Sequence, residues 1–350
     1  MKDDILEKPE EKSFSLLDVL KKVSPGRVLR TAIDDIVSGR MGALIVVDSP
    51  SVKGIFKGGF KINCILTAQK LVELSKMDGA IILSSDLSKI LYANTLLIPN
   101  PELSSVETGT RHKAAERTAK QTNTLVVAVS ERKGSITVYQ GNIRYVLIDT
   151  EDILRRAIDT LQILERQREV FDELLINLNV LEMTNLVSVG DVCSVIQRLE
   201  MVNKMSGILN RYIVELGKEG TIVRMRLREV IKGLRESEDF ILKDYTARPT
   251  RAKNVLTSMS FDSLLDLENI SKIAFSYEQE KQLSPKGYRM LNSLGLNEKD
   301  TKNLITEFKN FDGILKADDT KLAEILKSSR DDFRKKIDSL KDQVMVGRKI

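Results

Sequence analysis

Apolar positions in the first 150 residues alternate between helical and strand spacing. Helical spacing recurs in four stretches, and short apolar runs rich in β-branched residues, which are typical of buried strands, occur in five. The helical stretches are 14–22, 28–38, 66–76 and 110–120, and the apolar runs are 43–48, 80–83, 125–130, 135–140 and 143–148. This alternation predicts an α/β domain over residues 1–150, with a mixed central sheet flanked by helices.

The pattern becomes helical throughout after residue 150. From Glu151 to about Tyr245 there is no Pro and only scattered Gly, and apolar residues recur at helical intervals between charge clusters such as 165–169. We predict two or three long amphipathic helices in an all-α middle domain, residues 151–282. Its sequence indicates a spacer or an oligomerisation bundle, and no residues there point to chemistry.

The last segment, residues 283–350, is predicted to be all-α with shorter helices. These are expected over 286–293, 298–308, 311–315, 319–327 and 331–340. The tight connector Leu294-Gly295-Leu296 joins the first two, as in a helix-hairpin-helix-like unit. Three basic residues in this segment are candidates for a face that binds DNA phosphates, although nearby Asp residues dilute the charge and a solvated helix face explains it equally well. They are Lys327, Arg330 and Arg334.

Composition narrows the class of protein. Of the 350 residues 42% are hydrophobic and 30% charged, as in an ordinary globular protein, and the net charge of +5 is compatible with an anionic partner without requiring one. Cys64 and Cys193 lie far apart, which argues against a disulfide framework and a Cys-rich zinc site. We find no signal peptide or membrane span and expect a cytoplasmic protein without membrane contact. Multi-His metal sites are excluded because His112 is the only histidine.

Asp78 is the first candidate for chemistry. It stands with Gly79 directly before the apolar run that begins at Ala80. A carboxylate at the mouth of a buried strand can bind Mg²⁺ or accept a proton, and a following glycine lets a ligand approach the backbone closely. Asp-Gly is also a common turn sequence, so turn formation is the competing explanation.

The second candidate is the start of the predicted helix at Gly109-Thr110. Its first turn carries Arg111, His112 and Lys113. Basic side chains there oppose the helix dipole, which places partial positive charge at a helix N-terminus. A bound phosphate would resolve this conflict, because backbone N–H groups and the basic side chains would converge on it. A solvated helix start is the alternative.

These two motifs together support a resemblance to a known family. Asp78-Gly79-Ala80 and Gly109-Thr110-Arg111-His112-Lys113 resemble the paired DGA and GTRHR motifs of diadenylate cyclases, in the same order and at a similar separation. The whole chain resembles the DNA-integrity-scanning branch of that family, which has a cyclase domain, a helical middle domain and a helix-hairpin-helix domain and assembles as an octamer.

The resemblance implies an activity and roles for particular residues. Members condense two ATP molecules into cyclic di-AMP and two pyrophosphates, with two sites facing each other across a dimer and Mg²⁺ or Mn²⁺ as cofactor. The implied catalytic residues are Asp78, Arg111 and His112. Asp78 would hold the metal and take the hydroxyl proton, and Arg111 and His112 would bind the phosphates. The implied nucleotide-binding residues are Gly79, Ala80, Leu97, Gly109, Thr110, Arg111, His112, Lys113, Ser130 and Arg132.

Two departures from the family pattern keep alternatives open. Lys113 stands where the family has a second arginine, which keeps the charge and loses the bidentate fork. The stretch 323–331 has no glycine where the family's DNA-binding hairpin has Gly-Ile-Gly. The sequence therefore predicts a cyclase regulated by DNA, and leaves open a cyclase without DNA control or a DNA-binding oligomer that senses ATP without turnover.

Overall fold

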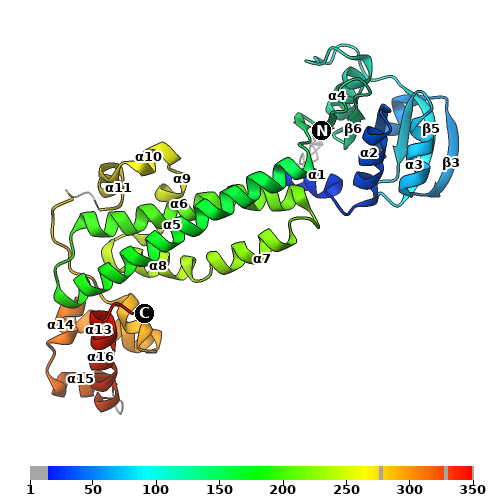
Figure 1. The fold of residues 1–350 in the computed structure, drawn as a ribbon. Coiled ribbons are helices and arrows are strands. Elements are labelled where there is room, and N and C mark those ends of the chain that lie inside the picture. Colours follow the sequence, from blue (N-terminus) through cyan, green and yellow to red (C-terminus); the bar gives the residue numbers. More distant parts are fainter. Residues whose placement is uncertain (1–14, 276–278, 327–329, 349–350) are drawn as a thin grey trace, which may run out of the picture. The chain divides into compact units, whose positions relative to one another are not determined.

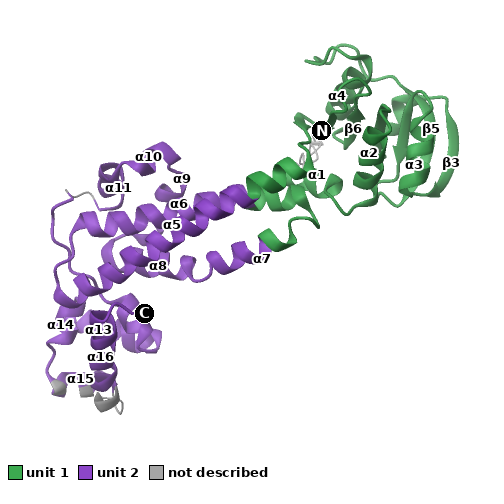
Figure 2. Ribbon diagram, in the orientation of Figure 1, with its two compact units in different colours: residues 1–157, 210–223 green, residues 158–209, 224–350 purple. Residues whose placement is uncertain are grey.

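The computed structural model describes residues 15–275, 279–326 and 330–348. The chain divides into two compact units, shown in Figure 2. One comprises residues 1–157 together with 210–223, and the other comprises 158–209 together with 224–350.

The first unit is built on a mixed sheet, as the sequence predicts (Figure 1). Its strands are β1 (Ala43–Val47), β2 (Phe56–Lys57), β3 (Phe60–Ile65), β4 (Ala80–Leu83), β5 (Lys89–Leu97), β6 (Val126–Val129), β7 (Ile136–Gln140) and β8 (Ile143–Val146). They lie in the order β2-β5-β4-β1-β6-β7-β8, with β3 also paired to β5. The β1–β4 pair is parallel and the other pairs are antiparallel.

Helices cover both faces of this sheet. Alternating side chains of β1 separate the two cores, because Ala43, Ile45 and Val47 point to one face whereas Leu44 and Val46 point to the other. The first face packs against α1 (Leu16–Val23), α2 (Val28–Ser38) and α3 (Ala68–Ser75). The second face packs against α4 (Thr110–Thr122) through Ala115 and Ala119, whose small side chains let the helix approach closely.

The predicted elements of this unit are found close to their predicted bounds, but β2, β3 and β5 are additional. These three strands form one side of the sheet, and β3 is mostly exposed. The register between β3 and β5 shifts between Lys61 and Cys64, and that between β4 and β5 shifts as well. The regular alternation of inward and outward side chains that predicts a strand is therefore broken in β3 and in β5.

The helices after the sheet begin with two long ones. These are α5 (Thr150–Thr184) and α6 (Val189–Leu216), followed by α7 (Thr221–Val230), α8 (Leu234–Tyr245), α9 (Pro249–Ser258), α10 (Phe261–Leu265) and α11 (Leu267–Ala274). The two long helices agree with the prediction, whereas α9 to α11 were not predicted. In the described part of the chain, no helix is long and apolar enough to span a membrane.

The final helices match their predicted positions and share a core of their own. They are α12 (Tyr288–Ser293), α13 (Glu298–Phe308), α14 (Phe311–Leu315), α15 (Asp319–Leu326) and α16 (Arg330–Met345). The buried carboxylate of Asp244 at the end of α8 accepts hydrogen bonds from the backbone N–H groups of Gly287, Tyr288 and Arg289. Arg289 also forms a buried ion pair of 2.7 Å with Glu182 of α5. These contacts attach the final helices to the helices that precede them.

Candidate active site

The start of α4 has the features of an anion-binding helix terminus. The helix begins at Thr110, as the sequence predicts, and Gly109 precedes it in extended conformation without a side-chain cap. No acidic residue lies in the first turn, and the space beside the Gly109 α-carbon is open. The N–H groups at this end are therefore available to an incoming phosphate.

Strand register brings three parts of the sequence to one edge of the sheet. β1 runs parallel to β4 with Ile45 opposite Ile81, and continuing this register places Asp78 beside Gly42. β1 runs antiparallel to β6 with Ala43 opposite Val129, which places Ser130 on the other side of Gly42. The predicted residues Asp78 and Ser130 thus flank the start of the same central strand.

Arg111 reaches this edge from α4. A Cβ atom added to Gly42 would lie 2.0 Å from Nη1 of Arg111 and 2.8 Å from its Cζ, so the guanidinium rests against the Gly42 α-carbon. Arg111, Asp78 and Ser130 therefore come together although they are distant in sequence. The sequence analysis did not identify Gly42, whose position directly before a buried strand was the available signal.

Gly79 has a structural reason to be glycine that differs from the one expected. Its φ is +89°, and a Cβ would lie 2.7 Å from the carbonyl oxygen of Thr95 in β5. The Thr95 hydroxyl in turn donates to the Ala80 carbonyl over 2.9 Å, in the buried interior. The glycine therefore permits close packing of β4 against β5, and its role in the close approach of a nucleotide stays a prediction. Asp78 itself is exposed and open to solvent.

His112 lies near a carboxylate from the preceding loop. Partial burial lowers the pKa of His112, and the charges of Arg111, Arg144 and Lys133 lower it further, against the opposing effect of Glu107. Since the ordinary pKa is already near 6.5, the imidazole is mostly neutral at pH 7. It can then serve as a hydrogen-bond partner for a phosphate or a hydroxyl group.

Glu107 is held by two donors that the sequence analysis did not identify. It accepts hydrogen bonds of 2.8 Å from the Tyr139 hydroxyl and 2.7 Å from Nε of Arg144. Burial would raise the pKa of Glu107, but the hydrogen bonds from Arg144 and Tyr139 outweigh it and lower the pKa. Glu107 is therefore a fixed negative charge near His112.

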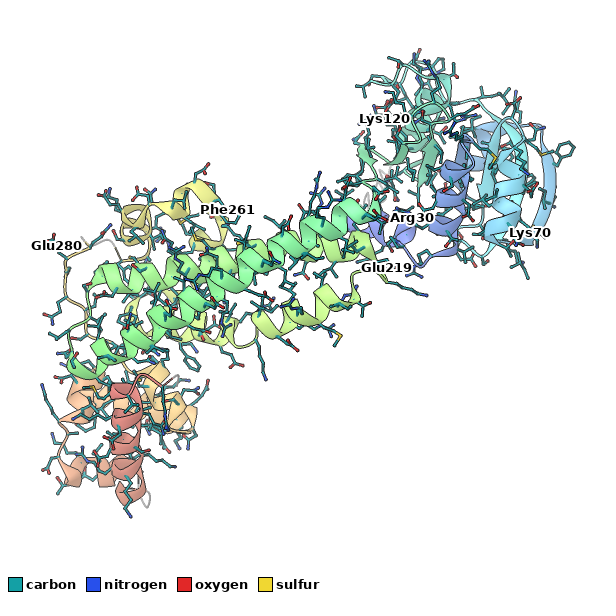
Figure 3. The ribbon with its side chains drawn as sticks, in the orientation of Figure 1. Arg30, Lys70, Lys120, Glu219, Phe261 and Glu280 are labelled. Carbon is teal, nitrogen blue, oxygen red and sulfur yellow. The ribbon has the colours of Figure 1, made fainter. Side chains whose placement is uncertain are left out.

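Other residues of α4, further along the helix, hold the loop before it. Glu116 accepts from the Ser105 hydroxyl at 2.6 Å and from the Val106 N–H at 3.1 Å. Arg117 donates to the Leu103 carbonyl at 2.8 Å, and Lys120, labelled in Figure 3, donates to that of Ser104 at 2.8 Å. These contacts fix the approach of the chain to Gly109, so α4 itself holds the loop that leads into its N-terminus.

The remaining predicted nucleotide residues lie on nearby elements. Leu97 ends β5 and is partly buried on the α4 face, beside the paired rings of Phe56 and Tyr92, whose centroids are 5.2 Å apart. This apolar group suits a nucleobase. Ala80 is fully buried, and Lys113 is half-buried with its N–H bonded to the Gly109 carbonyl at 2.8 Å.

Ser130 and Arg132 stand at the turn after β6. The Ser130 N–H donates to the Ser135 carbonyl at 2.9 Å, and its carbonyl accepts from the Gly134 N–H at 2.8 Å. A cavity of about 300 Å³ is lined here by Val37, Arg40, Met41, Ser130, Glu131, Arg132 and Gly134. Arg40 was not among the predicted residues.

Asp78 fits a metal ion that is shared with substrate. Among the described residues no group of three or more His, Cys, Asp or Glu side chains could enclose a metal ion. Mg²⁺ is commonly held by one or two carboxylates together with substrate phosphates and water. An exposed aspartate at the same end of the sheet as the uncapped start of α4 is compatible with that arrangement.

The basic residues predicted to bind DNA are less well supported by their contacts. The guanidinium of Arg334 donates to the backbone carbonyls of Leu315 and Ala317, which gives it a role in packing α16 against the end of α14. Lys327 lies outside the described residues, and the Arg330 side chain is not among those described.

Comparison with known proteins finds two consecutive segments of the chain that match models of one family. Residues 30–143 match the model described as DisA bacterial checkpoint controller nucleotide-binding, and residues 147–283 match that described as DisA bacterial checkpoint controller linker region. The chain is 41% identical to the DNA integrity scanning protein DisA of Acetivibrio thermocellus over 90% of both chains. It is 39% identical to DisA of Clostridioides difficile over 89% of this chain and 90% of that one.

A solved structure of DacA from Staphylococcus aureus is 25% identical. It covers 38% of this chain and 89% of its own, with a TM-score of 0.29.

Proposed function

The chain belongs to the DisA family and is a diadenylate cyclase, and from this we propose that it joins two ATP molecules into cyclic di-AMP with release of two pyrophosphates. The convergence of Asp78, Arg111 and Ser130 at one sheet edge, next to the uncapped start of α4, is the observation that best supports this proposal.

Each half of the reaction is a displacement at the α-phosphorus. The 3′-hydroxyl oxygen of one ATP forms a bond to the α-phosphorus of the other, the bond to the β-phosphate oxygen breaks, and pyrophosphate leaves. The same step with the roles exchanged closes the ring. Catalysis of this kind depends on positioning and on stabilising negative charge.

Specific residues are assigned to these tasks. We assign the α-phosphate and the leaving pyrophosphate to Thr110, Arg111, His112 and Lys113 together with the N–H groups of α4. Ser130 and Arg132 bind the phosphates from the β6 side, and the adenine packs near Leu97. A bound Mg²⁺ or Mn²⁺ supplies charge neutralisation at the phosphates, and Asp78 is the residue that holds it and takes the hydroxyl proton.

Two sites must face each other, because one site binds only half of the reactants. We therefore propose a face-to-face dimer of cyclase domains within a larger homo-oligomer, an octamer by resemblance. Dilution tests this directly. Specific activity is expected to fall when the protein concentration is lowered below the dissociation constant of the dimer, and to recover when the protein is concentrated again. Specific activity that stays constant while sedimentation shows a monomer would contradict the facing arrangement.

Regulation by DNA is the second part of the proposal. The terminal helices α12 to α16 would bind DNA phosphates through basic residues, including Lys327 and Arg330, with marked salt dependence. The packing contacts of Arg334 favour the alternative of a cyclase without DNA control. Gel shifts with linear and branched DNA at low and high salt separate these, since the alternative predicts no binding even at low salt.

A further inference from the structure

Arg40 occupies an uncommon backbone conformation at the end of α2. Its φ is +52°, in the left-handed region, and it directly follows Gly39, the helix cap. The N–H groups of Arg40 and Met41 close the helix on the carbonyls of Val37 and Ile36 at 2.9 and 3.0 Å. Glycine or asparagine usually fills this position, because a Cβ is unfavourable there. An arginine in such a position suggests that its side chain has a separate use.

The side chain of Arg40 lines the 300 Å³ cavity together with Ser130 and Arg132. Its lining includes two arginines and one acidic residue, Glu131, and the remaining lining residues are uncharged. Within the described part of the chain, the Arg40 side chain forms no hydrogen bond or ion pair. The cavity therefore presents unneutralised positive charge in a volume that suits a small anion.

Arg40 and Ser130 place this cavity at the same end of β1 as the candidate active site. Arg40 lies two residues before Gly42, against which Arg111 rests. Ser130, at the cavity wall, flanks Gly42 through the β1–β6 register. Three arginines, Arg40, Arg111 and Arg132, therefore lie near one end of β1.

We propose that Arg40, beside Arg132, is a further binding residue for a pyrophosphate-class anion, and that it supplements the binding of the leaving group by the start of α4. This inference rests on the proposed function for its physiological ligand. The planar guanidinium groups bind adjacent phosphate oxygens in pairs, which a lysine cannot do. The contact of Arg40 with the phosphates would explain why an arginine occupies this unfavourable backbone conformation.

Replacement of Arg40 by glycine separates binding from folding. Arg40→Gly removes the guanidinium and relieves the left-handed conformation, so we expect an equal or higher Tm together with at least tenfold weaker binding of inorganic pyrophosphate, measured by calorimetry. Arg40→Lys keeps the charge and is expected to bind with intermediate affinity. A matched control is Lys309→Gly, which also removes a cation at positive φ after a helix, at +67°, and is expected to leave pyrophosphate binding unchanged.

The calorimetry needs no turnover, so the binding role of Arg40 and the cyclase activity are tested separately. Pyrophosphate affinity that is the same in Arg40→Gly as in the unmodified protein overturns the binding role, even if cyclic di-AMP is formed normally. Conversely, a protein that forms no cyclic di-AMP but loses pyrophosphate binding on Arg40→Gly substitution supports the binding role and rejects the proposed reaction.

Discussion

The guanidinium of Arg111 lies directly against the α-carbon of Gly42, in space that a Cβ would occupy at 2.0 Å from Nη1. The absence of a side chain on Gly42, at the start of β1, therefore leaves room for the Arg111 guanidinium beside Asp78 and Ser130. The atom that would be displaced is the far end of a flexible side chain, so the fold can absorb a substitution that the site cannot.

Gly42→Ala is expected to reduce kcat/KM for ATP about tenfold or more, because a charge-assisted contact of roughly 1.5–3 kcal/mol is misplaced. The Tm is expected to change little. Steady-state kinetics and thermal unfolding check both parts. Gly54→Ala is the matched control, since the space at Gly54 is open. Additive effects of Gly42→Ala and Arg111→Ala in the double variant would show that Gly42 does not act through Arg111.

Lys113→Arg tests the departure from the family motif. If position 113 binds phosphate, the bidentate guanidinium is expected to preserve activity or to raise it by up to about tenfold, mainly through a lower KM. Kinetics with ATP as the varied substrate measure this. A large loss of activity with unchanged folding would mean that this site is adapted to lysine and that the family role does not apply there.

His112 permits a direct electrostatic measurement because it is the only histidine in the chain. We expect its NMR titration midpoint to lie below 6.5, since burial and neighbouring positive charges lower the pKa. Glu107→Gln removes the negative charge that opposes this effect, so the midpoint is expected to fall further. A midpoint above 6.5, or a rise on Glu107→Gln, would contradict the geometry described for these two residues.

Glu200 of α6 is expected to make the stability of the helical region depend on pH. Burial and the adjacent Glu238 raise its pKa to about 7, while Lys204 and Lys253 oppose the shift. The folded state then binds the proton more tightly than the unfolded state, so the contribution of Glu200 to stability is full below about pH 4.5 and is lost as the pH rises through about 7. The expected loss is on the order of 1–3 kcal/mol.

Urea unfolding midpoints at pH 5 and pH 8 measure this effect. Glu200→Gln is expected to reduce the loss of stability between the two pH values, because the glutamine has no proton to release. Glu236→Gln, at an exposed position on α8, is the control and is expected to behave like the unmodified protein. Equal pH dependence in all three proteins would show that Glu200 is not the responsible group.

The sequence predicted the elements in which local pattern and packing agree. β1 and β4 are continuous apolar runs that are buried on both faces, and α4 begins at the predicted Thr110. β3 and β5 were missed because Asn63 and Asn94, with φ of +45° and +54°, interrupt their alternation near the register shifts. Their pairing depends on contacts between distant segments, which periodicity does not report.

The candidate site was predictable where a motif carries the chemistry, as at Asp78 and Arg111. The residues that act on the site through a partner distant in the sequence were not predictable. Gly42 matters because of Arg111, and Tyr139 and Arg144 matter because both donate to Glu107. These relationships arise only after the sheet has brought the segments together.

The most direct test is incubation of the purified protein with ATP and Mg²⁺ or Mn²⁺, followed by chromatography and mass detection of the product. We predict cyclic di-AMP, and its loss in Asp78→Asn with folding preserved, because Asp78 is exposed. Bound ATP without any cyclic di-AMP, or normal product formation by Asp78→Asn, would contradict the mechanism proposed for this site.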